Sequence, residues 1–190
     1  MSPRVPDAPE GLDRMGFDRT GLDRMWAGWR TEYIDAVVGE GAARVDACLF
    51  CALGDAEPDE ALVIVRGDDC YAVLNAYPYT SGHMMVVPNR HVGELDDLTA
   101  QEATRVMAMT QQATTAIRAA YAPEGMNVGM NLGRAAGAGI PGHLHVHVLP
   151  RWSADTNFMT SVAESRVLPE PLSKALERLR AAWPSPGPRS

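Results

Sequence analysis

The chain has 190 residues, of which 46% are apolar and 22% are charged, an ordinary composition for a folded globular protein. A chain of this length can bury enough surface to fold as one domain, so its three cysteines are not needed as a disulfide framework. The formal charge of −7 argues against a nucleic-acid partner held by many phosphate contacts.

The first 20 residues mix acidic and basic side chains and contain no apolar run, which is unlike a secretory signal peptide. The sequence also has no stretch of about 18 apolar residues that would suit a membrane span. An odd number of cysteines fits a reducing compartment. We therefore expect a cytoplasmic protein without a membrane partner.

One globular domain in three parts is predicted. Residues 1–45 form an N-terminal helical extension, because apolar side chains recur at helical spacing from Leu22 to Val37. This stripe suits either packing on the core or a subunit interface. Residues 46–160 form the main domain, and residues 161–190 carry a closing helix, 172–183, and a Pro-rich tail that we expect to be frayed.

Short strands dominate the first half of the main domain. A Cys-x-x-Cys segment and a short polar loop precede two apolar runs, 62–65 and 70–74, which flank a turn and predict a β-hairpin. Residues 83–87, closed by Pro88, predict a third strand. Thr99 and Glu102 have capping-box spacing, and the apolar pattern after them predicts a long helix that stops before Pro123.

Two further strands are predicted after this helix, at 126–132 and 143–149, with a glycine-rich loop between them. The order of elements favours an α+β fold, an antiparallel sheet of about five strands with helices packed on one face. The segment 143–147 places histidine at every second position of the last strand, so all three side chains lie on one face. Neighbouring histidines are then about 6.6 Å apart and the outer two about 13 Å, so the three should have different roles.

The three histidines leave two other interpretations open. They could be solvated or hydrogen-bonded side chains on a polar sheet face. His145 and His147 could also be paired ligands of a catalytic zinc, as in a metal-dependent hydrolase. That second interpretation lacks an evident general base.

The segment His143 to Pro150 resembles the signature of the histidine triad (HIT) superfamily, in which histidines alternate with apolar residues. Other motifs occur in the order and spacing of that family, so the resemblance extends from about Cys48 to Asn157. The flanks at 151–152 and 155–159 are similar to those of a bacterial branch that includes diadenosine tetraphosphate phosphorylases. These other motifs are Cys48-x-x-Cys51, Leu74 to Pro78, Gly82-His83, Val86 to Pro88, Arg90-His91 and Asn131.

The resemblance implies a HIT-like fold and covalent chemistry at the middle histidine. His145 would attack the α-phosphorus of a nucleotide and form a nucleotidyl-histidine, which requires an unprotonated ring nitrogen and an acceptor for the other N–H. His147 would hydrogen-bond the phosphate or the leaving oxygen. Water as the second acceptor would give hydrolysis, and inorganic phosphate would give phosphorolysis.

The resemblance also implies residues that bind the nucleotide. Asn75 matches the position that binds the ribose hydroxyls, and a turn residue is its alternative; Asn131 matches a phosphate-binding position. Ala138 and Gly139 belong to a loop whose backbone N–H groups would approach phosphate oxygens, although the Ser or Gln-Ser of many relatives is absent. Trp152 would stack on a second adenine or lie in the core. The candidates to offset polyphosphate charge, or to be surface charges, are Arg90, Arg134 and Arg151.

Two cysteines at zinc-knuckle spacing complete the set of candidate residues. The resemblance pairs Cys48 and Cys51 with His91 and His143 as four ligands of a structural zinc. A redox dithiol and free buried cysteines are the alternatives. Cys70 is expected in the core, and no organic cofactor is implied.

The resulting hypothesis is an enzyme that cleaves diadenosine tetraphosphate with inorganic phosphate to ATP and ADP through His145. A dinucleoside polyphosphate hydrolase and a nucleoside phosphoramidase are alternatives within the superfamily, and a non-catalytic nucleotide-binding module is an alternative of another class. The family is commonly dimeric, so we expect a homodimer or a homotetramer whose partners are a nucleotide and phosphate.

Overall fold

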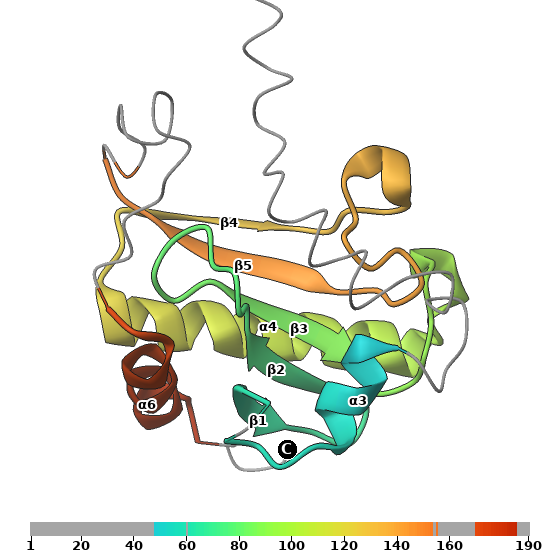
Figure 1. Ribbon diagram of the computed structural model, residues 1–190, viewed down its shortest axis with the longest axis horizontal. Helices are drawn as coiled ribbons and strands as arrows, with labels where there is room; N and C mark the ends of the chain where they lie inside the picture. Colours follow the sequence, from blue (N-terminus) through green and yellow to red (C-terminus); the bar gives the residue numbers. More distant parts are fainter. Residues whose placement is uncertain (1–47, 60, 154, 156–169, 186–190) are drawn as a thin grey trace, which may run out of the picture.

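The computed structural model describes residues 48–59, 61–153, 155 and 170–185. The predicted N-terminal helix at 22–37 therefore lies outside the described residues. Within the described ranges, no helix has the length and apolarity needed to cross a bilayer. Five strands form one antiparallel sheet in the order β1-β2-β3-β5-β4 (Figure 1). Their bounds are β1 Val63–Arg66, β2 Cys70–Leu74, β3 Met84–Pro88, β4 Gly125–Gly129 and β5 Val146–Arg151.

The main core lies between one face of this sheet and two helices, α4 (Ala100–Tyr121) and α6 (Leu172–Ala182) (Figure 1). Val146 and Val148 point into this core, as their alternation with the histidines predicts. The hairpin, the third strand, the long helix and the closing helix are thus confirmed. Two short 3₁₀ turns, η3 (Leu95–Asp97) and η4 (Arg134–Ala136), are also present.

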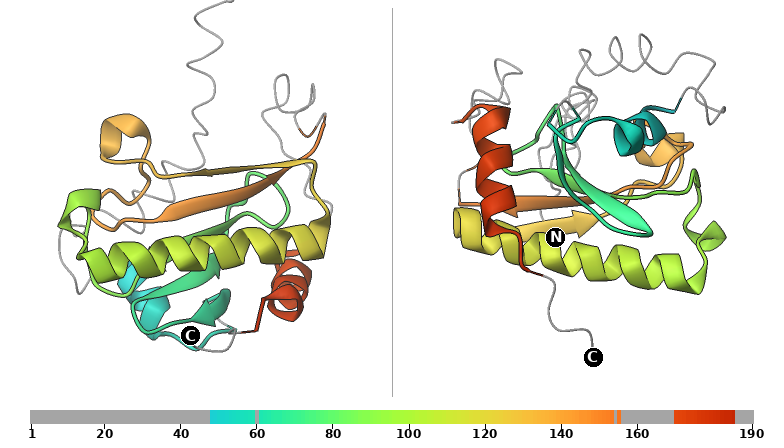
Figure 2. Two further views of the ribbon diagram at one scale, coloured as in Figure 1. Left: turned by 180° about the vertical axis from the view of Figure 1, so that it is seen from behind. Right: turned by 90° about the horizontal axis from the view of Figure 1, so that it is seen from below.

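A third helix, α3 (Leu49–Asp55), packs on the opposite face, so the prediction of helices on one face only was wrong (Figure 2). The sequence also predicts a loop directly after the Cys-x-x-Cys segment, where the structure continues the helix to Asp55. Contacts from the sheet stabilise this seven-residue helix: the Tyr71 hydroxyl donates to the Phe50 carbonyl at 2.6 Å, and Arg66 donates to the carbonyls of Leu53 and Ala56. A helix this short depends on such tertiary contacts.

The last two strands differ from their predicted bounds. β5 begins at Val146 rather than at residue 143, because the His143 N–H donates to Ile140 in a turn and the Leu144 N–H donates to Val92 outside the ladder. β4 ends at Gly129, which pairs with His147 near the start of β5. The shorter β5 therefore leaves the chain beyond Gly129 with no regular strand to pair with.

The predicted capping box at the start of α4 is present and carries an ion pair. The Glu102 carboxylate accepts from the Thr99 N–H at 2.8 Å and from the Arg90 guanidinium at 2.8 and 2.9 Å. These bonds, first of all those from Arg90, lower the pKa of Glu102 to about 2. Arg90 is thus engaged in the fold rather than directed at a substrate.

This carboxylate predicts an acid-dependent stability. Because the pKa of Glu102 is lower in the folded chain than in the unfolded one, its stabilisation is present above about pH 4.5 and is lost as the pH falls toward 2. We expect Glu102→Gln to lower the unfolding free energy by about 1 kcal/mol at pH 7 and to flatten its acid dependence. Urea unfolding between pH 2 and 7 measures both effects. Glu94→Gln, which changes an exposed carboxyl nearby, should leave the profile unchanged, and a steep profile retained in Glu102→Gln would contradict the assignment.

Candidate functional site

His145 is held in one tautomer by the backbone. Its Nδ1 lies 2.8 Å from the His143 carbonyl oxygen, which is an acceptor, so Nδ1 carries the proton and donates. In the neutral ring the other nitrogen, Nε2, therefore carries the lone pair. The side chain is 5% exposed and lies on the sheet face that α3 covers. This is the arrangement that a nucleophilic imidazole requires.

His83, for which the sequence analysis found no role, is fully buried beside His147. The Tyr79 backbone N–H donates to Nδ1 of His83 at 3.1 Å, so a neutral His83 ring has its proton on Nε2. That Nε2 lies 3.0 Å from Nδ1 of His147 and donates to it. His147 must then hold its own proton on Nε2, as a hydrogen-bond donor. The rings of His145 and His147 lie 4.9 Å apart.

Asn75 lies in a turn beside His83, the residue that contacts His147. Its side-chain oxygen accepts from the Tyr77 N–H at 3.0 Å, which is an Asx turn, and its Nδ2 lies 3.3 Å from Nδ1 of His83. The turn interpretation of Asn75 therefore describes its observed contacts. The ring of Tyr79 stacks on His83 with centroids 4.8 Å apart. A lone-pair nitrogen and an N–H donor thus lie side by side on a preorganised frame.

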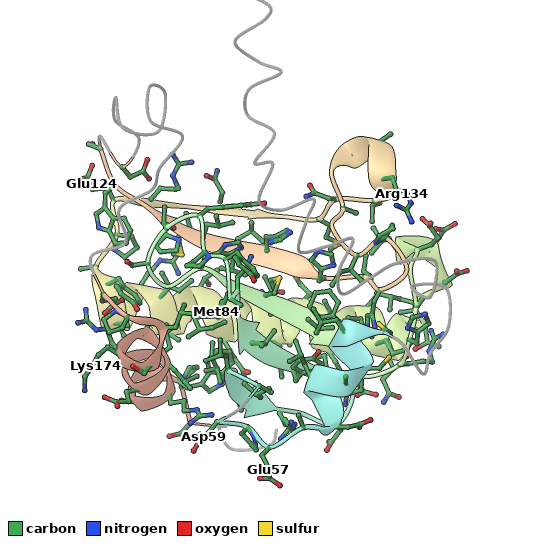
Figure 3. All side chains as sticks on the ribbon, viewed as in Figure 1. Glu57, Asp59, Met84, Glu124, Arg134 and Lys174 are labelled. Carbon is green, nitrogen blue, oxygen red and sulfur yellow. The ribbon has the colours of Figure 1, made fainter. Side chains whose placement is uncertain are left out.

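The candidate phosphate loop, which runs from Asn131 to Gly139, makes hydrogen bonds within itself. The Asn131 side chain lies within hydrogen-bond distance of the Gly137 carbonyl, at 3.4 Å, and the Ala138 N–H donates to Gly133 at 3.3 Å. Gly139 is half-buried in the same loop. Figure 3 shows Arg134 on η4 at this end of the sheet, far from Glu124 at the other end. Arg134 is exposed, and it is the one candidate arginine for which no ion pair is found among the described residues.

Trp152 does not join the histidines. Its ring packs edge to face against Tyr121 at the end of α4, with centroids 6.4 Å apart. Tyr121 packs on the main core, so Trp152 lies on the helical side of the sheet. Arg151 is also engaged elsewhere: it donates to Asp155 and, at 2.7 Å, to the Asn127 side chain. The structure places neither Trp152 nor Arg151 beside His145 and His147.

Cys48, Cys51, His91 and His143 come together beside the histidine pair, from segments far apart in the sequence. One ligand atom from each lies within 4.8 Å of the others. The distances from sulfur to Nδ1 are 3.2 Å for Cys48 and His143, 3.4 Å for Cys51 and His91, and 3.6 Å for Cys51 and His143. A tetrahedral zinc separates its sulfur and nitrogen ligands by about 3.5 Å. The cluster therefore fits a metal ion of this kind.

The ring of His143 is oriented for this cluster. Its Nε2 donates to the Pro88 carbonyl at 2.9 Å, so the lone pair lies on Nδ1, toward the two sulfurs. Burial lowers the pKa of His143 to about 4, which keeps the ring neutral. Gly93 helps to bring His91 near, because a Cβ there would meet the Pro141 carbonyl oxygen at 3.1 Å. Cys70, in contrast, is buried in the main core as expected.

Comparisons with known proteins point to one family. A family model described as HIT domain matches residues 57–154, inside the predicted main domain. A Mycobacterium tuberculosis protein named AP-4-A phosphorylase is 42% identical over 175 residues, which are 90% of each chain. A Schizosaccharomyces pombe protein named bis(5'-nucleosyl)-tetraphosphatase (asymmetrical) is 36% identical over 84 residues, 44% of this chain and 46% of that one.

Among solved structures, a zinc-bound histidine triad family protein from Mycobacterium smegmatis superimposes with a TM-score of 0.58 and 30% identity. The match covers 71% of this chain and 91% of that one. The alternating histidines, the antiparallel sheet and these similarities lead to one conclusion: the chain belongs to the histidine triad (HIT) family.

Proposed function

We propose that the protein is a phosphorylase that cleaves diadenosine tetraphosphate with inorganic phosphate, giving ATP and ADP. One observation carries the proposal: the His143 carbonyl holds Nδ1–H of His145, which in the neutral ring leaves the lone pair on Nε2, beside the N–H donor on His147. The similarity to a protein named AP-4-A phosphorylase supports this substrate and this acceptor over the family's other reactions.

In the first step, Nε2 of His145 attacks the α-phosphorus of one adenosine moiety. A P–N bond forms, the bond from that phosphorus to the bridging oxygen breaks, and ATP leaves. The proton on Nε2 of His147 is placed to hydrogen-bond the negative charge that develops on the phosphate or leaving oxygen. The His143 carbonyl stabilises the positive charge on the attacking ring by accepting from Nδ1.

In the second step, a phosphate oxygen attacks the same phosphorus and displaces His145. The P–N bond breaks, ADP forms, and the imidazole recovers its lone pair. We place Asn131 and the backbone of Ala138 and Gly139 next to the phosphate chain, because the strand that leads into this loop pairs Gly129 with His147. Asn75 stays our candidate for the ribose, with Trp152 outside the proposed site.

Product analysis with and without phosphate tests the reaction. Incubation with diadenosine tetraphosphate should give ATP and ADP only when phosphate is present. Formation of two ADP, or of AMP and ATP, without phosphate would reject phosphorolysis in favour of hydrolysis. Binding of the nucleotide with no products under either condition would favour a nucleotide-binding module.

Substitution of His83 tests the proposed positions of the ring protons on His83 and His147. His83→Ala removes the N–H that fixes the tautomer of His147, so we expect kcat to fall about tenfold to a hundredfold, less than the 10²–10³-fold typical of deleting a donor outright. His83→Gln, which offers a side-chain N–H, should recover part of this loss. Steady-state kinetics measure the change, and an unchanged kcat in His83→Ala would contradict the arrangement.

We also propose that the metal held by Cys48, Cys51, His91 and His143 is zinc, with a structural role. Two thiolates and two imidazoles are a common ligand set for structural zinc, and four protein ligands leave no open position for substrate. The zinc-bound relative from Mycobacterium smegmatis supports this identity. The metal would hold α3 against the sheet, while the histidine pair does the chemistry.

We further propose a cytoplasmic homodimer or homotetramer whose other partners are the nucleotide and phosphate alone. β4 is an edge strand, which offers unpaired backbone groups to a second copy, and its Val128 side chain is 48% exposed. The mass in solution, measured by light scattering, distinguishes these assemblies from a monomer.

A further inference from the structure

His143 connects the metal cluster to His145, through two different parts of the same residue. Its ring directs Nδ1 toward the sulfurs of Cys48 and Cys51, at 3.2 and 3.6 Å. Its carbonyl oxygen accepts from Nδ1 of His145 at 2.8 Å. The side chain of one residue therefore serves the metal, and the backbone of the same residue fixes the nucleophile.

Phe50 is a second bridge between the two sites. It lies on α3, between Cys48 and Cys51 in the sequence, and is 3% exposed. Its ring packs against both histidines, with centroids 5.5 Å from His143 and 4.9 Å from His145. The Tyr71 hydroxyl bonds its carbonyl at 2.6 Å, in a buried position. A metal ion bound by the cysteines would order α3 and, with it, the Phe50 ring. The packing of that ring against His145 therefore depends on the cysteines.

We propose that Phe50 is a positioning residue, and that with the His143 carbonyl it couples the metal cluster to the nucleotide site. Metal binding fixes α3 and His143, and thereby the nucleophile; nucleotide binding orders His145 and, through the same contacts, the cluster. This coupling rests on the proposed function. Linkage is reciprocal, so each ligand must raise the affinity for the other by the same factor.

Metal release to a chromogenic chelator measures this coupling without any turnover. The probe is a diadenosine tetraphosphate analogue with a methylene group in place of both the α,β and the α′,β′ bridging oxygens, so that neither end has a leaving oxygen for His145 to displace. With the zinc-loaded full chain, we expect a saturating concentration of the analogue to raise the apparent zinc affinity about tenfold, within the range of 5- to 150-fold typical of coupled sites.

Phe50→Leu keeps an apolar side chain on α3 but removes the ring that touches both histidines. We expect this variant to bind zinc and the analogue, with the coupling reduced to about twofold or less. Leu53→Ala is the matched control, because Leu53 lies on the same helix and packs against the same group of apolar residues between α3 and the sheet. It should weaken α3 and yet retain most of the coupling.

The outcomes separate this inference from the proposed function. A wild-type chain that binds zinc and the analogue independently overturns the coupling alone. Full coupling in Phe50→Leu, or an equal loss in Leu53→Ala, overturns the role of Phe50. A chain that holds no zinc overturns the zinc site together with the coupling, whereas a chain that does not bind the analogue overturns the proposed function together with the coupling.

Discussion

Replacing His145 with alanine should lower phosphorolysis of diadenosine tetraphosphate by about 10⁴-fold or more, because the reaction loses its nucleophile. His143 also has a lone pair that the backbone fixes, but its Nδ1 faces the metal cluster, and Nδ1 of His147 accepts from His83. Initial rates of ATP formation at saturating phosphate measure the loss.

A folding defect is separated from a chemical one by rescue. In His145→Gly, added free imidazole should restore part of the rate, since a small molecule in the vacated space supplies the missing nitrogen. The midpoint of thermal unfolding should stay within a few degrees of the wild-type value. A His145→Ala protein that retains its turnover would rule out the covalent mechanism.

Removing the metal should produce the largest change in stability. With free zinc at about 1,000 times its dissociation constant, binding adds about 4 kcal/mol to the unfolding free energy, and a strong chelator removes this contribution. Cys48→Ser should give the same loss without a chelator, because it removes a buried ligand. Urea unfolding with and without chelator measures both.

Cys70→Ala is the matched control for this experiment. Cys70 is a buried thiol outside the cluster, so its variant should lose some packing energy but keep the full response to the chelator. Elemental analysis after purification without added metal gives the occupancy. A zinc content under about 0.2 ion per chain, or a stability that does not respond to the chelator, would contradict the four-ligand site.

The features that the sequence alone predicts well are those that depend on residues close together in the chain. The capping box at Thr99 fixes the start of α4, and the left-handed Ala122 before Pro123 marks its end. The alternation of Val146 and Val148 with histidine gives the two faces of β5 correctly even though the strand begins three residues later than predicted. Each of these depends on neighbours within a few residues.

The features that could not be predicted from the sequence depend on which strands and helices contact one another in the fold. α3 is too short to show a periodic pattern, and Tyr71 and Arg66 on neighbouring strands hold it in place. His83 reaches His147 only because β3 pairs with β5, an arrangement that chain order does not reveal. For Trp152, its position after the triad left stacking on a base and packing in the core both open, and strand parity places it on the helical side, against Tyr121.

The nucleotidyl-histidine itself is the most direct test of the proposed mechanism. The enzyme is mixed with diadenosine tetraphosphate without phosphate, quenched in alkali within one turnover, and digested for mass spectrometry, because a phosphorus–nitrogen bond survives base. We predict one AMP group attached to His145, formed together with one equivalent of ATP. Stoichiometric release of ATP with no AMP on the chain, or with AMP attached to another residue, would contradict the account.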